Sequence, residues 1–279
     1  MLIMFISGLS IRYRVSAPND QFTQASGVQG GLAPPNSNGT MGVNVLLHGD
    51  GGQSFFDFPN QGVNANLMGV AVLSPDKNRK WGGSSRNGQQ RPDGVAHSQA
   101  VVDLITNELP AMVAFDQSQV FFTGVSGGSL TLSGFLMPAH MGLFPNSGVL
   151  LNCGALQPQI EMAPDAATAL ANTRIHFQST TQELASLQQD IPEAIKAYEQ
   201  VALAAGLSRQ QINSLQTADN TPNGGHCAFD EKDFVSGVQL MADNFANVVQ
   251  AGGNGLVPGI GNVAQGVVGT QLRFSQGRN

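Results

Sequence analysis

The stretch Gln119–Leu130, Gln-Val-Phe-Phe-Thr-Gly-Val-Ser-Gly-Gly-Ser-Leu, decides the fold of this chain. Its first half is β-branched and aromatic, which favours a strand, and it then breaks into glycine around Ser126. Leu130, Leu132 and Phe135 can supply the buried face of a helix after the break. The pattern is G-x-S-x-G between a strand and a helix. It predicts a strained turn that lifts the Ser126 hydroxyl above the edge of a sheet.

The same turn offers a place for negative charge. Gly127 stands at the start of the predicted helix, where backbone N–H groups favour an anion. A second glycine-rich loop, His48–Gly52, follows a short apolar strand, and its free N–H groups would lie at the carboxyl edge of the sheet. We therefore expect Gly49, Asp50 and Gly127 to form an oxyanion hole beside Ser126.

Length and composition narrow the class of protein. The chain has 279 residues, of which 41% are hydrophobic, so it can bury a sizeable core, and we expect residues 1–279 to form a single domain. Charged residues make up 11%, well below the roughly 25% of ordinary globular domains. A net charge of −6 without any Lys/Arg cluster argues against a nucleic-acid partner. No run approaches the roughly 20 apolar residues of a membrane span.

Strand-like and helix-like segments alternate along the chain. Further strands are predicted at 10–16, 43–47, 70–73, 147–152 and 174–178. Helices are predicted from Asp93 to Leu109, at 191–205, from Ser208 and over 234–248. This alternation predicts an α/β fold with a mainly parallel sheet and helices on both faces. Residues 154–172 could cover the site, and the Gly-rich tail 251–279 has no clear assignment.

Three further features leave alternatives open. Met1–Leu9 is apolar without a basic start, so either it is the remnant of a signal peptide or the signal peptide has been removed. Cys153 and Cys227 are two buried thiols or one disulfide; the even count in a chain poor in Lys and Glu favours a disulfide and a secreted protein. Trp81, in the long polar loop 74–92, lines a substrate pocket or packs under the loop.

A serine nucleophile needs a base and a carboxylate that orients the base. Of five histidines, His226 comes late in the chain, in a Gly-Gly-His turn before the last long helix. The other four have structural interpretations; they are His48, which would brace the glycine loop, and His97, His140 and His176. The acid should follow the strand 174–178.

Two carboxylates meet that condition. Glu183 comes first, and Asp190 is the alternative, although Asp190 before Ile191-Pro192 also looks like a helix N-cap. Asp165 and Asp230 are weaker candidates.

Together, the loop His48–Gly52, the elbow Gly124–Gly128 and His226 resemble the α/β-hydrolase superfamily, from about residue 10 to residue 250. Within it the chain looks most like secreted esterases of the polyhydroxybutyrate-depolymerase and feruloyl-esterase kind. One departure is that the superfamily acid is usually Asp, whereas Glu183 comes first here.

The resemblance implies an α/β-hydrolase fold and a serine hydrolase that cleaves carboxylic esters through an acyl-enzyme on Ser126, with His226 as general base. It implies no metal and no organic cofactor, and a small-molecule or polymeric ester as substrate. In this fold Cys153 and Cys227 both lie at the catalytic edge, where a disulfide would pin the His226 loop. The alternatives are a serine peptidase or amidase with the same residues, and a non-catalytic binding protein.

Overall fold

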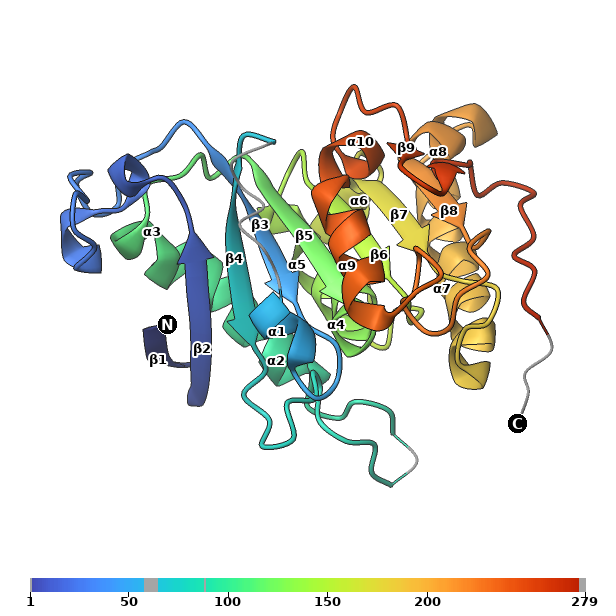
Figure 1. Ribbon diagram of the computed structural model, residues 1–279, viewed down its shortest axis with the longest axis horizontal. Coiled ribbons are helices and arrows are strands. Elements are labelled where there is room, and N and C mark those ends of the chain that lie inside the picture. Colours follow the sequence, from blue (N-terminus) through green and yellow to red (C-terminus); the bar gives the residue numbers. More distant parts are fainter. Residues whose placement is uncertain (1, 58–64, 88, 276–279) are drawn as a thin grey trace.

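A computed structural model describes residues 2–57, 65–87 and 89–275; Met1 and the last four residues of the tail 251–279 lie outside the described part. An eight-stranded sheet runs through the molecule in the order β1-β2-β4-β3-β5-β6-β7-β8 (Figure 1). The strands are β1 (Leu2–Ile6), β2 (Leu9–Ser16), β3 (Gly42–Leu47), β4 (Leu67–Leu73), β5 (Val120–Val125), β6 (Gly148–Asn152), β7 (Arg174–Gln178) and β8 (Gln216–Asp219). β2 is antiparallel to both of its neighbours, and the strands from β4 to β8 are mutually parallel.

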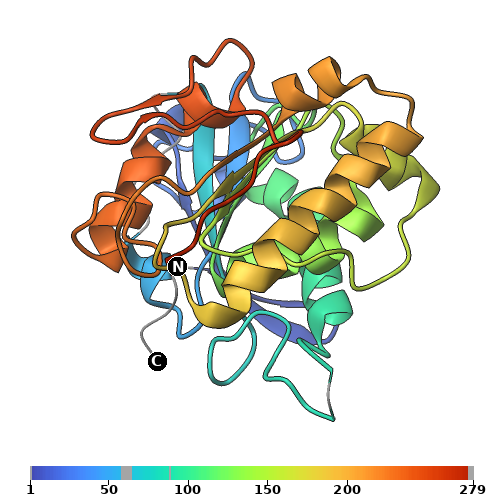
Figure 2. The same ribbon diagram turned by 90° about the vertical axis from the view of Figure 1, so that its right-hand side faces the viewer.

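Helices cover both faces of the sheet, as Figure 2 shows with the sheet between them. One face carries α1 (Gln53–Asp57), α9 (Phe234–Asp243) and α10 (Phe245–Val249). The opposite face carries α2 (Gly94–Asp103), α3 (Leu109–Met112), α4 (Gly127–Thr131), α5 (Met137–His140), α6 (Pro164–Leu170), α7 (Ala185–Ala204) and α8 (Arg209–Leu215). The mainly parallel α/β architecture predicted from the alternation of strands and helices is confirmed.

The central strand β5 explains why its sequence is almost continuously apolar. Val120 and Phe122 belong to the core under α4, whereas Phe121 and Val125 belong to the core under α9 and α10. Successive side chains of a strand point to opposite faces, so a strand covered on both sides needs apolar residues at nearly every position. The strand order places the end of β5, and with it Ser126, at the middle of the sheet edge.

Three of the differences from the sequence prediction concern β1, β8 and α7. Leu2–Ile6, inside the run considered as a signal remnant, forms β1 and pairs with β2 through a turn at Ser7-Gly8, both at positive φ. β8 was missed because Gln216–Asp219 is largely polar; it pairs with β7 and with the tail. α7 begins at Ala185, six residues before the predicted start, so Asp190 lies inside this helix and is not its N-cap.

The tail folds back onto the sheet. A hairpin of β9 (Leu256–Val257) and β10 (Gly261–Asn262) is followed by a segment that runs beside β8, where Ala218 N–H donates to Gln265 O at 2.8 Å. This contact covers the edge of the sheet that β8 would otherwise leave unpaired.

The segment 154–172 packs along the helical segment 127–140 that follows Ser126. Leu156 N–H donates to Ser133 Oγ at 2.8 Å, and Ala163 N–H donates to Pro138 O at 2.9 Å. Its first residue, Gly154, faces Ser126. A Cβ added to Gly154 would lie 3.1 Å from Ser126 O, which is a tight contact. Within the described residues, no helix combines the length and the apolar character needed to cross a bilayer.

Candidate active site

Ser126 occupies a sharp turn between β5 and α4, with φ 47° and ψ −113°, a conformation that non-glycine residues rarely adopt. Its N–H donates to Asn152 O at 2.8 Å, and its carbonyl accepts from Leu130 N–H at 3.0 Å. The flanking glycines are sterically required. A Cβ on Gly124 would approach Ser129 N to 2.6 Å, and one on Gly128 would overlap the Leu47 carbonyl.

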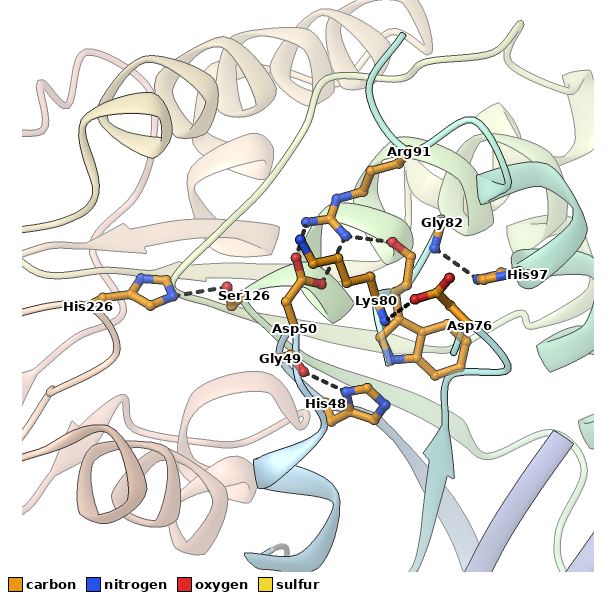
Figure 3. Close-up of polar contacts among 11 residues, drawn as sticks. His48, Gly49, Asp50, Asp76, Lys80, Gly82, Arg91, His97, Ser126 and His226 are labelled. Carbon is orange, nitrogen blue, oxygen red and sulfur yellow. Dashed lines mark hydrogen bonds and ion pairs between the residues drawn. The ribbon is translucent and has the colours of Figure 1, made fainter. Parts of the chain in front are cut away.

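Three side chains form a continuous hydrogen-bond chain at this edge. His226 Nε2 lies 2.9 Å from Ser126 Oγ, and His226 Nδ1 contacts Glu183 Oε1 (Figure 3 shows the serine and the histidine). The Glu183 side chain is fully buried, whereas 20% of the His226 side chain is exposed. Leu184 N–H also donates to Glu183 Oε1 at 2.8 Å, which fixes the carboxylate from a second side. The arrangement can therefore deprotonate the serine hydroxyl and stabilise the imidazolium that results.

The other carboxylates considered from the sequence lie elsewhere. Asp190 is on α7, where burial and then the nearby Glu193 raise its pKa. Asp165 lies in the first turn of α6, where Ala166 N–H donates to it at 2.9 Å. Asp230 faces Lys232 at 4.0 Å. Of these acids and Glu183, only Glu183 contacts His226 among the described residues.

A disulfide joins Cys153 to Cys227, as expected from the cysteine count, with both residues completely buried. It connects the end of β6 to the residue after His226, with Cα atoms 5.1 Å apart. The sulfur atoms and the His226 ring are the one group of His, Cys, Asp or Glu ligand atoms close enough to hold a metal within the described residues. Because both sulfurs are in the disulfide, neither is a thiolate, and the group does not offer a thiolate metal site.

The loop His48–Gly52 lies next to Ser126 and is braced by a buried imidazole. Ser74 N–H donates to His48 Nε2 at 2.9 Å, so the proton is on Nδ1, which donates to Gly49 O at 2.6 Å. Burial lowers the pKa of His48 to about 4, which keeps the ring neutral. The expectation that His48 braces the loop is confirmed.

One of the three N–H groups expected for the oxyanion hole is already in use. Gly49 N–H donates to Ser54 Oγ at 2.9 Å, so Gly49 is removed from the set of free donors. The described residues place no acceptor on the N–H groups of Asp50 and Gly127. These two remain available for an oxygen bound at Ser126.

Trp81 does not line a substrate pocket: it is 0% exposed and packs between His48 and His97, with ring centroids 5.5 and 6.1 Å away. Its packing under the loop 74–92 is the alternative that the structure supports. His97 Nδ1 accepts from Gly82 N–H at 2.9 Å, and burial lowers the pKa of His97. His176 is buried against Thr217 and Gln178, so it also has a structural role.

Sequence reasoning missed two side chains beside Ser126. Arg91 forms a bidentate ion pair with Asp50, at 3.0 Å for Nη1–Oδ1 and 2.9 Å for Nη2–Oδ2 (Figure 3). Phe234, at the start of α9, packs 6.1 Å from the His226 ring and lies next to Gly49. An arginine in a polar loop and an aromatic in an amphipathic helix carry no local signal that would have separated them from ordinary surface and core residues.

Comparisons with known proteins bear on the fold. No family model and no curated protein matches the chain. A thermostable esterase superimposes with a TM-score of 0.50 at 16% identity, covering 80% of this chain and 55% of its own, so this chain spans little more than half of that protein. Acyl-protein thioesterase 2 from Zea mays gives a TM-score of 0.50 at 16% identity, covering 83% of this chain and 98% of its own. An arylesterase gives a TM-score of 0.50 at 8% identity, covering 87% and 81%.

At these identities the likeness concerns the arrangement of the chain. It is a likeness of fold, in line with the mainly parallel eight-stranded sheet covered by helices on both faces. This chain has the α/β-hydrolase fold.

Proposed function

We propose that the chain is a serine hydrolase that cleaves carboxylic esters, with Ser126 as nucleophile, His226 as general base and Glu183 as the acid that orients His226. The observation that carries the proposal is the unbroken hydrogen-bond chain from Ser126 Oγ through His226 to Glu183. A serine hydroxyl is a weak nucleophile at neutral pH, and such a chain is what activates it.

In the proposed reaction, Ser126 Oγ attacks the ester carbonyl carbon while His226 Nε2 takes the hydroxyl proton. The tetrahedral intermediate collapses when His226 returns that proton to the leaving alcohol oxygen, which leaves an acyl group on Ser126. Water then attacks the acyl-enzyme, and His226 Nε2 takes a proton from the water. The carboxylic acid departs and the serine regains its proton.

The negative charge of the intermediate needs donors that are already in place. We assign this role to the N–H groups of Gly127 and Asp50, because both flank Ser126 and neither has an acceptor among the described residues. Two such donors are worth several orders of magnitude in rate, since removing one typically costs about 10²- to 10³-fold.

The fold neighbours and the disulfide bear on the substrate and on the compartment of the protein. Proteins named as esterases and as an acyl-protein thioesterase share the fold, and this supports an ester as the substrate that we propose for this chain. A fully buried disulfide beside the site supports a secreted protein, because such bonds persist in oxidising compartments. The finer esterase kinds are distinguished by assaying polyhydroxybutyrate film and methyl ferulate.

The test combines a covalent probe with a substrate panel. A fluorophosphonate should label Ser126, as mapped by peptide mass spectrometry, and p-nitrophenyl esters should be hydrolysed faster than matched p-nitroanilides. Ser126→Ala should abolish labelling, whereas Ser129→Ala, which removes a buried hydroxyl three residues away, should retain it.

Each rival function has its own outcome. Faster cleavage of anilides would favour the peptidase or amidase. Folded wild-type protein that neither reacts with the probe nor cleaves any ester would favour a binding protein.

A further inference from the structure

A carboxylate lies beside the proposed oxyanion site. The Asp50 side chain turns over Gly127, so a Cβ on Gly127 would overlap Asp50 Oδ1 and lie 3.1 Å from Arg91 Nη1. Because a Cβ lies about 2.5 Å from its own backbone nitrogen, Asp50 Oδ1 is within about 5 Å of Gly127 N. An uncompensated negative charge at that distance opposes the oxyanion that Gly127 N–H would stabilise.

Arg91 compensates this charge. Its two terminal nitrogens pair with the two oxygens of Asp50, and the pair is partly shielded, with 12% of the Arg91 side chain and 30% of the Asp50 side chain exposed. Among the described residues, no other basic group forms an ion pair with Asp50. The nearby Arg79 guanidinium instead lies over the Phe56 ring, 5.7 Å from its centroid.

The backbone around Arg91 holds the guanidinium in place. Arg91 Nη1 also donates to Trp81 O at 2.5 Å, and Trp81 is anchored in the core. Gly94 N–H donates to Arg91 O at 2.9 Å. Asp93 N–H donates to Gly82 O at 2.9 Å, so the backbone on the two sides of the loop 82–93 is joined directly. Arg91 itself has a φ of 50°, a conformation that surrounding contacts must maintain. The fork of the arginine therefore meets the carboxylate in one geometry.

We propose that Arg91 is a positioning residue that neutralises Asp50 and fixes it over Gly127, so that the two backbone N–H groups act on the oxyanion without an opposing charge. The inference rests on the proposed function. Arg91 acts through Asp50 and not on the substrate, because its three hydrogen bonds to Asp50 and Trp81 already use the edge of the guanidinium that faces the site.

A double-mutant cycle that removes the two charges tests the proposal. The variants are Arg91→Met, Asp50→Asn and the double variant, assayed by kcat and KM on neutral p-nitrophenyl acetate and by the rate of fluorophosphonate inactivation. Arg86→Met is the matched control, because Arg86 pairs with Asp93 on the same loop, with 63% and 38% of the two side chains exposed.

Arg91→Met leaves a bare carboxylate beside the oxyanion, so kcat should fall about 10- to 100-fold with KM changed by less than about 3-fold. Asp50→Asn removes the carboxylate and keeps the backbone N–H, so Arg91→Met should lower kcat far less in the Asp50→Asn background than in the wild type. The double variant should recover kcat to within about 5-fold of wild type, because both charges are gone. Arg86→Met should match wild type.

An unchanged kcat in Arg91→Met overturns the inference and leaves the proposed function intact. So does a double variant no better than Arg91→Met, which would mean that the pair only holds the loop. If Arg91→Met does not fold, the double variant compared with Asp50→Asn still decides, since a further large loss of kcat in the double variant contradicts charge compensation. A KM increase confined to an anionic ester, p-nitrophenyl hydrogen succinate, would show that Arg91 binds substrate instead. Wild-type protein unreactive at Ser126 would overturn the function and the inference together.

Discussion

Glu183 Oε1 contacts His226 Nδ1 although 43 residues separate the two in the chain, and the Glu183 side chain is completely buried while the imidazole is partly exposed. The second donor to this oxygen, Leu184 N–H, belongs to the chain just before α7. A helix start and a histidine loop thus meet at one carboxylate oxygen, which sets the direction in which His226 faces Ser126.

Replacing Glu183 by Gln should lower kcat/KM by about 10³- to 10⁴-fold, because an amide of the same shape no longer stabilises the correct tautomer of His226 or its imidazolium. Glu183→Asp should lose less, since the charge is kept at a shorter reach. Steady-state kinetics on p-nitrophenyl acetate measure both.

Asp190→Asn is the control for this prediction, because Asp190 lies on α7 and was the other acid considered from the sequence. It should keep wild-type kcat/KM. A large loss in Asp190→Asn together with an active Glu183→Gln would reverse the assignment of the acid.

Removing the disulfide should destabilise the protein and slow the reaction. The bond closes a loop of 74 residues, for which restriction of the unfolded chain corresponds to about 4 kcal/mol of unfolding free energy. Because Cys227 follows His226, the histidine loop should also be held less well. Cys153→Ala/Cys227→Ala should therefore show a lower Tm and a kcat reduced several-fold.

Adding a phosphine reductant to the wild type should shift Tm in the same direction and leave the double variant unaffected. Peptide mass spectrometry before reduction should show no free thiol. Two alkylatable thiols in the untreated protein would contradict the bond.

The buried His48 should make stability depend on pH in a defined window. Burial lowers its pKa to about 4 in the folded protein, below the value of about 6.5 in the unfolded chain. Between these values the unfolded state binds a proton that the folded state does not, so the free energy of unfolding falls as pH drops from about 6.5 to 4. The loss from this group is about 3 kcal/mol.

Urea denaturation at pH 7.5 and pH 4.5 of wild type and His48→Asn isolates this contribution, because the other buried histidines cancel in the difference. The wild type should lose more stability than the variant on acidification. Equal losses would show that His48 does not remain neutral through this range.

Phe234 should help to select the alcohol part of the ester. His226 returns its proton to the leaving oxygen, so the alcohol must lie on the His226 side of Ser126, where the Phe234 ring packs. A Cβ on Gly49 would lie 3.3 Å from Phe234 Cζ and 3.4 Å from Ser126 Cβ, so glycine keeps this side open.

Phe234→Ala should therefore raise KM for phenyl and long-chain alcohol esters by about 10-fold and change methyl esters little. Val235→Ala, at the next and more exposed position, is the matched control. It should leave the ratio of KM for phenyl esters to KM for methyl esters unchanged. Equal effects of Phe234→Ala on phenyl and methyl esters would place the alcohol elsewhere.

Several features could be predicted because their signals are local. The double-sided apolar pattern of β5 and the glycines around Ser126 depend on neighbours a few residues apart, and backbone sterics alone demand them. The capping box at Ser208–Gln211 is likewise a local hydrogen-bond pattern, and the helix predicted from Ser208 begins with it. β8 escaped prediction because Gln216–Asp219 is largely polar, and its partners are the distant β7 and the tail, where Val267 N–H donates to Gln216 O.

By itself the sequence determined the α/β fold, the turn at Ser126, the late His226 and the short choice between Glu183 and Asp190, because chain order and periodicity encode these. Tertiary structure alone decided that Gly49 N–H is occupied by Ser54, that Trp81 is a core residue, and that Arg91 faces Asp50 across 41 residues. Hydrogen bonds and ion pairs of this kind depend on where two distant backbones place their side chains. That placement is fixed by the packing of the whole sheet and by no pattern within either segment.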